Sequence, residues 1–384
     1  MQALNSLTTV VQMGIFAVLL PRAAFDDYAV WITSTMFAIG LGQAVGSERV
    51  VIGRRSFADG MSSAWSLGIA IFVVQAGVAA WMHSPELAVC ALGVLFWAVW
   101  DFLRIVQGFD RAGLFLGRDL IVVLIQVGAV VAAWALGLPA HLLVVVWWGV
   151  GTVLWPVFII QLGLATAAAR RGGFRVLWHD RRESTPLLLD AALAGVPLVL
   201  ALALARSQGS EGDASAARMA LTILGPVTVL GIAGRRIVYS ARAAGGFSAR
   251  ARAMFTAAVG VVFVVCFAIL VMTRTPLYPL LLPGFAGLTW WAIIGFSTNH
   301  ASVMAAMLPA ANLRADRRSL DVGAARVLST LSAVVFVWLY APFDTVAHVA
   351  WCVASSSIVY ALVLYAVSLV RPPRIVAEPV EQGV

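Results

Sequence analysis

Polar side chains at helical spacing lie within the first apolar segment of the chain. Asn5, Thr8 and Gln12 follow one another at intervals of three and four residues, which places them on one face of a helix. A polar face is costly in lipid, because hydrocarbon offers it no hydrogen-bond partner. The pattern therefore predicts either the wall of a polar cavity or hydrogen bonds to a neighbouring helix.

A second polar group, which includes Asn299 and His300, lies near the middle of a later apolar segment. A histidine at that depth could contact a sugar or take part in proton coupling, because imidazole titrates near physiological pH. The structural alternative is a neutral histidine held by a neighbouring hydroxyl group. Both residues are candidates for substrate binding, and His300 is also a candidate for ion coupling.

Two aspartates within apolar segments are further candidates for ion coupling. Asp101 precedes Arg104 by three residues, so a structural ion pair on one helix face is the alternative. Asp190 follows Thr185-Pro186, a pair that starts a helix well, and the helix dipole would favour an acid in its first turns. Asp119 lies at the start of another predicted helix and has the same structural explanation.

Three arginines lie near the ends of apolar segments and could together hold an anion. Arg22, Arg206 and Arg218 carry planar guanidinium groups, which suit a diphosphate. Each could instead extend its charge to the lipid headgroups while its stem stays in the apolar layer. The three arginines are therefore candidate cavity residues with a structural alternative.

Asp26-Asp27 resembles the paired acids that bind a metal-diphosphate in the first exterior loop of membrane glycosyltransferases. Those enzymes build their active sites from long exterior loops, whereas the gap from Pro21 to Asp27 is short. Phosphate-binding loops, metal-binding His/Glu motifs and serine elbows are absent from the sequence. The chain is accordingly predicted to be no enzyme and to use neither a cofactor nor a metal.

The composition sets the environment in which these residues act. Hydrophobic residues make up 61% of the chain and charged residues 11%, so the sequence predicts an integral membrane protein. The net charge of +8 comes from arginines in short gaps between apolar runs, which indicates membrane topology rather than nucleic-acid binding. Cys90, Cys266 and Cys352 lie inside apolar runs without ligand-like spacing and are predicted to be core residues.

A bilayer core of about 30 Å needs about 20 apolar residues per helix. The sequence then predicts an all-α membrane protein with about twelve spans, near 3–21, 28–46, 62–82, 87–107, 119–138, 141–165, 186–206, 216–238, 252–273, 286–309, 320–341 and 346–370. With cytoplasmic N and C termini, all but four of the 26 basic residues fall on the cytoplasmic side, as the positive-inside rule requires. The four exterior arginines are Arg22, Arg206, Arg218 and Arg274.

A basic linker divides the chain into two halves of similar length. The prediction is an N-terminal six-helix lobe over 1–165, a cytoplasmic linker over 166–185, a C-terminal six-helix lobe over 186–370 and a disordered tail over 371–384. Pro156, Pro197 and Pro226 lie inside predicted spans, where each would free a backbone carbonyl and allow a bend. A packed helix can tolerate such prolines, although they often mark where a transporter helix flexes.

The first two segments carry a family resemblance. The run AVLLPRAAFDDYAVW, followed by LGQAVGSERVVIGRR, resembles the opening of the Wzx-like polysaccharide flippases of the multidrug/oligosaccharidyl-lipid/polysaccharide exporter (MOP) superfamily. Val18 stands where that family usually has arginine, and Pro21 where it has glycine. The run ARMALTILGPVTVLGIAGRRIV, over 217–238, resembles the eighth helix of such exporters, particularly actinobacterial forms.

This resemblance implies an alternating-access transporter that flips a polyprenyl-diphosphate oligosaccharide across the bacterial cytoplasmic membrane. It would act as a monomer among membrane lipids, beside the polymerase and glycosyltransferases of the same pathway. One alternative is a major-facilitator transporter for small solutes, although Val50 and Val51 occupy the places of the acidic and basic residues in its characteristic loop. The other alternative is a polytopic glycosyltransferase.

Overall fold

The computed structural model describes residues 2–42, 56–107, 111–162, 181–227, 249–275, 288–315, 318–338 and 344–370, with positions 47, 50 and 175. In these ranges the chain is helical and has no strand. The first half contains α1 (Gln2–Leu19), α2 (Arg22–Gly42), α4 (Phe57–Trp81), α5 (Pro85–Gln107), α6 (Ala112–Ala135) and α7 (Ala140–Gln161). The second half contains α10 (Arg181–Gln208), α11 (Asp213–Ile223), α13 (Ala249–Val271), η2 (Met272–Arg274), α15 (Trp290–Ala315), α16 (Ser319–Trp338) and α17 (Thr345–Val370).

Local sequence signals fix several helix ends. Ser56 caps α4, since its hydroxyl accepts from the backbone nitrogen of Asp59 at 3.2 Å. Gly137 adopts a φ of 75° just beyond the end of α6, a backbone conformation that favours glycine. Asp344 caps α17, because its Oδ1 accepts from the backbone nitrogen of Ala347 at 2.8 Å.

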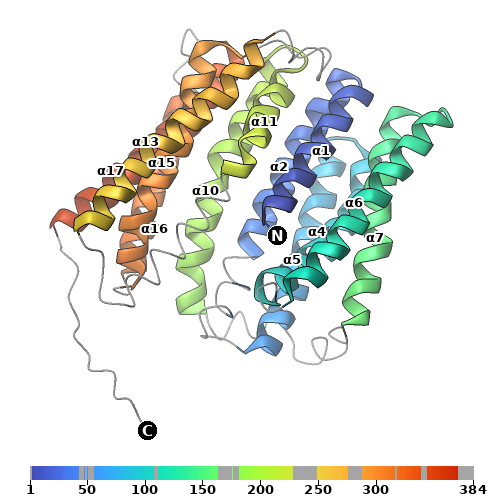
Figure 1. Cartoon of the computed structure of the whole chain (residues 1–384), viewed down its shortest axis with the longest axis horizontal. Coiled ribbons are helices and arrows are strands. Elements are labelled where there is room, and N and C mark those ends of the chain that lie inside the picture. Colours follow the sequence, from blue (N-terminus) through green and yellow to red (C-terminus); the bar gives the residue numbers. More distant parts are fainter. Residues whose placement is uncertain are drawn as a thin grey trace.

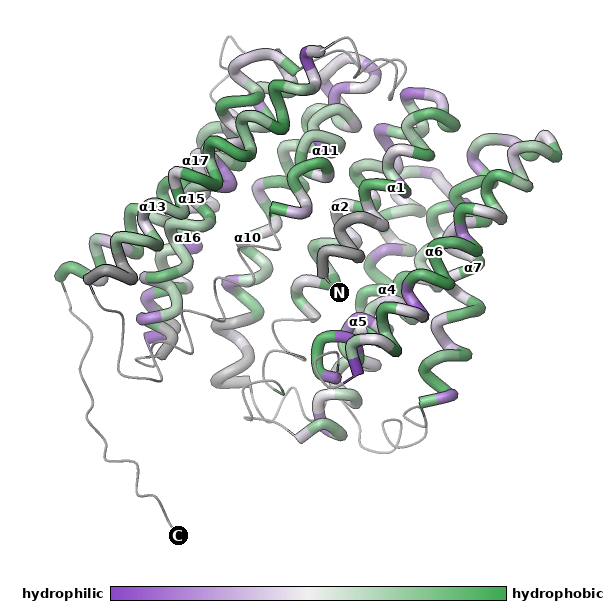
Figure 2. The backbone as a smooth tube through the Cα atoms, viewed as in Figure 1, coloured by the Kyte–Doolittle hydropathy of each residue, from purple (hydrophilic) through white to green (hydrophobic). Residues whose placement is uncertain are grey.

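Eight helices are long and apolar enough to cross a membrane within the part of the chain that the structure describes. Each of the twelve predicted spans overlaps one of the described helices. The all-helical membrane class is therefore confirmed, whereas the count of twelve spans and the side of the termini stay predictions. Apolar residues run along most helices, as Figure 2 shows.

Several helices begin earlier than the predicted spans. The helix predicted from residue 28 begins at Arg22, the one predicted from 119 begins at Ala112, and the one predicted from 186 begins at Arg181. The predicted ranges followed the apolar run alone, whereas a helix continues through polar residues wherever its backbone hydrogen bonds are made.

The helices form an N-terminal bundle of α1 to α7 and a C-terminal bundle of α10 to α17 (Figure 1). Large aromatic side chains fill the N-terminal core, where Trp31 meets Trp148 edge to face at 5.4 Å. The C-terminal core uses smaller residues, so α15 and α17 approach closely where Gly295 faces Ala350. The three cysteines are buried and free, as the sequence predicts.

The two bundles meet where α2 packs against α10 and α11, and where α1 packs against α11. These helices lie side by side in the middle of Figure 1. The packing is interlocked, because Val30 of α2 belongs to the core of the C-terminal bundle and Met219 of α11 belongs to that of the N-terminal bundle. Most of the predicted linker 166–185, and all of the predicted tail 371–384, lie outside the described residues.

Candidate functional site

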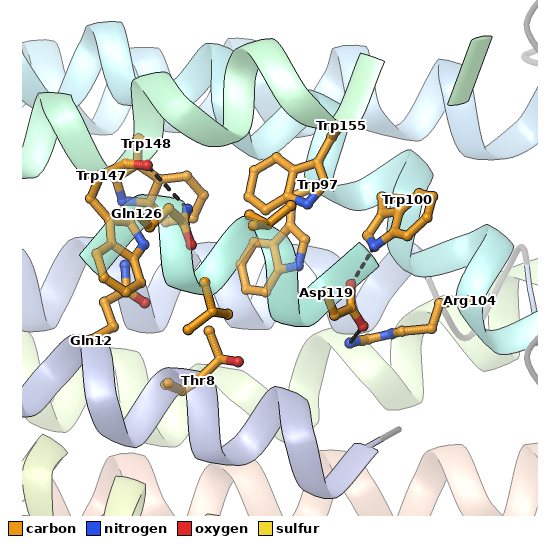
Figure 3. Close-up of a pocket in the computed structure, with 13 residues that line it drawn as sticks. Thr8, Gln12, Trp97, Trp100, Arg104, Asp119, Gln126, Trp147, Trp148 and Trp155 are labelled. Atoms are coloured by element: carbon orange, nitrogen blue, oxygen red, sulfur yellow. Dashed lines mark hydrogen bonds and ion pairs between the residues drawn. The ribbon is translucent and has the colours of Figure 1, made fainter. Parts of the chain in front are cut away.

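A cavity lined by both aromatic and polar side chains lies inside the N-terminal bundle, between α1, α5, α6 and α7 (Figure 3). Its volume is about 40 Å³, which leaves room for a few water molecules but not for a sugar. Residues at helical spacing on each of the four helices supply its wall. They are Thr8, Thr9, Gln12, Trp97, Trp100, Arg104, Asp119, Val122, Val123, Gln126, Trp147, Trp148 and Trp155.

Two charged side chains, Arg104 and Asp119, line one end of this cavity, and Asp101 lies behind Arg104. Arg104 pairs with Asp101 on its own helix, so the pair predicted from their spacing is confirmed. The same guanidinium lies 3.7 Å from Oδ2 of Asp119, and the indole nitrogen of Trp100 donates to Oδ1 of Asp119 at 2.7 Å. Asp101 and Arg104 are almost fully buried. One arginine therefore contacts two carboxylates in this cluster.

The other end of the cavity is held by amide side chains. Gln12 donates to the hydroxyl of Tyr28 at 2.5 Å, which joins α1 to α2. Gln126 donates to the backbone carbonyl of Trp147 at 3.1 Å, which joins α6 to α7. The polar face of the first helix thus serves both predicted purposes, because Thr8 and Gln12 line a cavity and Gln12 also bonds a neighbouring helix. The side chain of Asn5 lies outside the described residues.

Asp26 joins the two bundles at the end that the arginine distribution assigns to the exterior. Its Oδ2 accepts from the backbone nitrogen of Gly212 at 2.7 Å, and its Oδ1 accepts from that of Ser215 at 2.8 Å. Asp26 is 2% exposed. A carboxylate from α2 therefore caps the first turn of α11 in the other bundle.

Asp27 makes a second contact across the same interface. The Nε of Arg206, near the end of α10, donates to Oδ1 of Asp27 at 2.7 Å. Both acids of the Asp26-Asp27 pair therefore bind protein groups in this structure. The described residues contain no cluster of three or more His, Cys, Asp or Glu side chains that could hold a metal.

Arg218 lies in α11 at the same interface, three residues after Ser215, which Asp26 contacts. Its Nε is buried without a hydrogen-bond partner among the described residues. No carboxylate within the described ranges forms an ion pair with it. Arg22, at the start of α2, is exposed and lies beside Gly212. Arg218 and Arg22 are therefore available to an anion, whereas Arg206 is occupied by Asp27.

The predicted polar group of the C-terminal half lies elsewhere. Asn299 accepts from the hydroxyl of Ser357 at 2.6 Å, which joins α15 to α17. The Nδ1 of His300 is 3.0 Å from the carbonyl of Phe296, one turn earlier in the same helix. Neither residue lines the N-terminal cavity. The partner of His300 is a backbone carbonyl rather than the hydroxyl expected.

Asp190 is not explained by the start of its helix. Because α10 begins at Arg181, Asp190 lies more than two turns inside it, and the predicted cap at Thr185-Pro186 is wrong. Its Oδ1 instead accepts from the Nε of Arg326 at 2.9 Å, and the hydroxyl of Tyr360 lies 3.5 Å away. Arg326 also stacks on the Tyr360 ring, 3.4 Å from its centroid. This cluster joins α10, α16 and α17.

The same error applies to Asp119, which lies well inside α6 instead of at its start. Its place in the cavity was missed, although one signal for it exists in the sequence. Asp119, Val122 and Gln126 are spaced by three and four residues, so they share a helix face. The predicted binding and coupling roles themselves stay predictions, divided among the N-terminal cavity, the bundle interface and the C-terminal bundle.

Known structures show the same fold over nearly the whole chain. An inward-facing multidrug resistance MATE family transporter of the MOP superfamily aligns with a TM-score of 0.61 and 14% identity, covering 97% of this chain and 94% of its own. The eukaryotic MATE transporter AtDTX14 aligns with a TM-score of 0.65 and 11% identity, covering 96% and 93%. The MATE transporter VcmN of Vibrio cholerae gives 0.59 and 14%, covering 97% and 95%.

No protein-family model and no curated protein matches the sequence. The solved structures therefore define the fold alone. The chain has the fold of the MATE transporters of the MOP superfamily, and with its apolar helices it is a multi-pass membrane protein. These structural neighbours are MATE transporters, and their fold does not favour the major-facilitator alternative.

Proposed function

We propose that the protein is an alternating-access exporter of the bacterial cytoplasmic membrane, and that its cargo is a lipid-linked saccharide carrying a diphosphate. The MATE fold supports the transport mechanism, because two bundles that meet along α1, α2, α10 and α11 can open alternately on either side. The family resemblance of the first two helices supports the cargo.

The observation that carries the proposal is Arg218. A guanidinium with no carboxylate partner among the described residues is costly inside a bundle interface unless an anion joins it. A diphosphate suits such a group, since two of its oxygens can bind one guanidinium. Arg22, exposed near Gly212 at the same end of the interface, could hold the anion as it approaches the exterior.

In this proposal the N-terminal cavity has a structural role and does not bind the cargo. Its volume of about 40 Å³ excludes a saccharide, and its polar groups bond one another. The saccharide would therefore pass between the bundles.

Transport of a defined probe in proteoliposomes tests the proposal. The probe is a short polyprenyl-diphosphate N-acetylglucosamine, and lectin capture reports the sugar on the outer leaflet. We expect Arg218→Ala to abolish flipping and Arg218→Lys to retain part of it, because lysine keeps the charge but loses the planar fork. Arg274→Gln is the matched control, since Arg274 already bonds the Leu288 carbonyl at 3.0 Å. Equal flipping by wild type and Arg218→Ala would overturn the proposal.

Multidrug export is the second candidate function, because a multidrug resistance MATE transporter shares this fold. Dye efflux from intact cells separates the two. An exporter of cationic drugs should lose nothing, or gain activity, when the Arg218 charge is removed. Loss of saccharide flipping without a change in dye efflux supports the first candidate.

A further inference from the structure

We propose that α10 is a hinged gate helix, held at its exterior end by an inter-bundle latch and built to bend at Gly195–Pro197. The latch consists of Asp26 with the first turn of α11 and Asp27 with Arg206. This inference rests on the proposed alternating access, but it does not depend on the cargo. Three observations on α10 carry it.

The first observation is the latch itself. Its three hydrogen bonds join α2 to α10 or α11, across 179 to 189 positions of sequence. They lie at one end of the interface, so they close that end when formed. Asp344, at the same end, makes similar bonds to Thr289 and Ala347, but these stay within the C-terminal bundle. The latch is therefore specific to the contact between bundles.

The second observation is a tight contact further along the same pair of helices. Gly195 of α10 faces the ring of Phe37 in α2, and a Cβ placed at Gly195 would overlap that ring. Gly195 lies eleven residues before Arg206, and Phe37 lies ten residues after Asp27, so the contact is about 15 Å from the latch. A glycine facing an aromatic ring allows the two helices to approach more closely there than any side chain would permit.

The third observation is a missing backbone bond beside that contact. Pro197 has no N–H group, so the carbonyl of Leu193 lacks its donor within α10. The hydroxyl of Thr330 in α16 donates to this carbonyl at 2.9 Å. A helix bends most easily where such a bond is absent and another group satisfies the carbonyl. The bending point and the close contact thus coincide.

The part of α10 before the hinge is held by its own bundle. Asp190 binds Arg326 at 2.9 Å, and Thr330 binds the Leu193 carbonyl, so two groups of α16 fix this half. The part after the hinge carries Arg206 and continues to the capped turn of α11. When the latch opens, the exterior half can therefore swing away from α2 while the other half stays in place.

Exterior labelling of a cysteine introduced at position 30 tests this movement without any cargo. Val30 is buried between the latch and the Phe37 contact, so Val30→Cys reacts with a membrane-impermeant maleimide only when the exterior end opens. Intact cells are labelled, and the protein without Val30→Cys gives the background from the three buried native cysteines. The Val30→Cys protein with its latch intact supplies the closed reference.

We expect Asp26→Asn with Asp27→Asn to raise the labelling of the Val30→Cys protein about fivefold, because loss of contacts made only in the closed state shifts the equilibrium toward the open one. Asp344→Asn is the matched control and should leave labelling unchanged. An unchanged signal in the latch variant, or an equal rise in the control, overturns the latch.

Pro197→Ala tests the hinge in the latch-open variant. Alanine restores the missing backbone donor and stiffens α10, so we expect labelling to fall back toward the closed reference. Pro309→Ala in α15 is the control for a helix-interior proline outside the interface, and it should retain the raised labelling. Size-exclusion chromatography confirms that each variant is folded. Raised labelling that persists in Pro197→Ala overturns the hinge, whereas loss of saccharide flipping alone bears only on the cargo.

Discussion

Arg206 and Asp27 lie 179 positions apart in the sequence, yet their side chains form a 2.7 Å hydrogen bond between the two bundles. Both side chains are partly exposed, at 42% and 34%. The neighbouring Asp26 makes two bonds to backbone nitrogens and is nearly inaccessible. Two adjacent acids of α2 thus make inter-bundle contacts of different strength.

This difference predicts unequal losses of stability. We expect Asp26→Ala to cost about 1–2 kcal/mol, because it leaves helix-end N–H groups without an acceptor. Asp27→Ala should cost less than about 1 kcal/mol, as is usual for exposed ion pairs. Denaturant unfolding of the detergent-solubilised protein, followed by tryptophan fluorescence, measures both. A larger loss for Asp27→Ala than for Asp26→Ala would contradict the assignment.

The contact of Gly195 with Phe37 predicts a size rescue. Gly195→Ala adds a methyl group where the Phe37 ring already lies, so we expect a loss of about 1–3 kcal/mol, typical of an overpacked site. Gly195→Ala with Phe37→Leu should recover most of that loss, because the smaller side chain leaves room for the methyl group. The control is Gly128→Ala in α6, where a Cβ meets no atom within 4 Å. A double variant no more stable than Gly195→Ala would exclude direct steric conflict.

The bond between Gln12 and Tyr28 predicts a similar non-additive result. Tyr28→Phe leaves a buried amide donor without its partner, which costs about 1–3 kcal/mol. Gln12→Leu with Tyr28→Phe removes both polar groups and should cost less than Tyr28→Phe alone. Thermal unfolding of the two variants measures the difference, with Tyr365→Phe, at a partly exposed tyrosine of α17, as the control.

Local spacing predicted those features whose partners lie nearby in the sequence. The pairing of Asp101 with Arg104 and the polar face of Thr8 and Gln12 follow from the helical repeat alone. The helices themselves follow from the length of the apolar runs, since each run needs internal backbone hydrogen bonding.

Features that depend on distant segments could not be predicted in this way. Asp26 binds α11 and Asp190 binds α16, contacts that a single sequence does not reveal. The sequence also places Asp190 and Asp119 at helix starts, because the predicted spans follow apolar runs and omit the first helical turns. The sequence did contain one usable signal, a charged residue inside an apolar segment. Such a charge requires a partner in a membrane helix. Arg326, inside a predicted span, was the available partner for Asp190.

The buried charges of the N-terminal cavity predict an order of stability among single variants. Arg104 contacts both Asp101 and Asp119, so Arg104→Met removes one cation from two carboxylates at once. Breaking a buried ion pair in this way costs about 3–5 kcal/mol. Asp119→Asn should cost less, because asparagine can still accept from the Trp100 indole and Arg104 retains Asp101.

Arg318→Met is the matched control, since its pair with Asp321 is more exposed and lies at a helix end. Denaturant unfolding should rank the losses as Arg104→Met above Asp119→Asn, with Arg318→Met smallest. If Asp119→Asn instead destabilised the protein more than Arg104→Met, Asp119 would have to be the group that holds the cluster together.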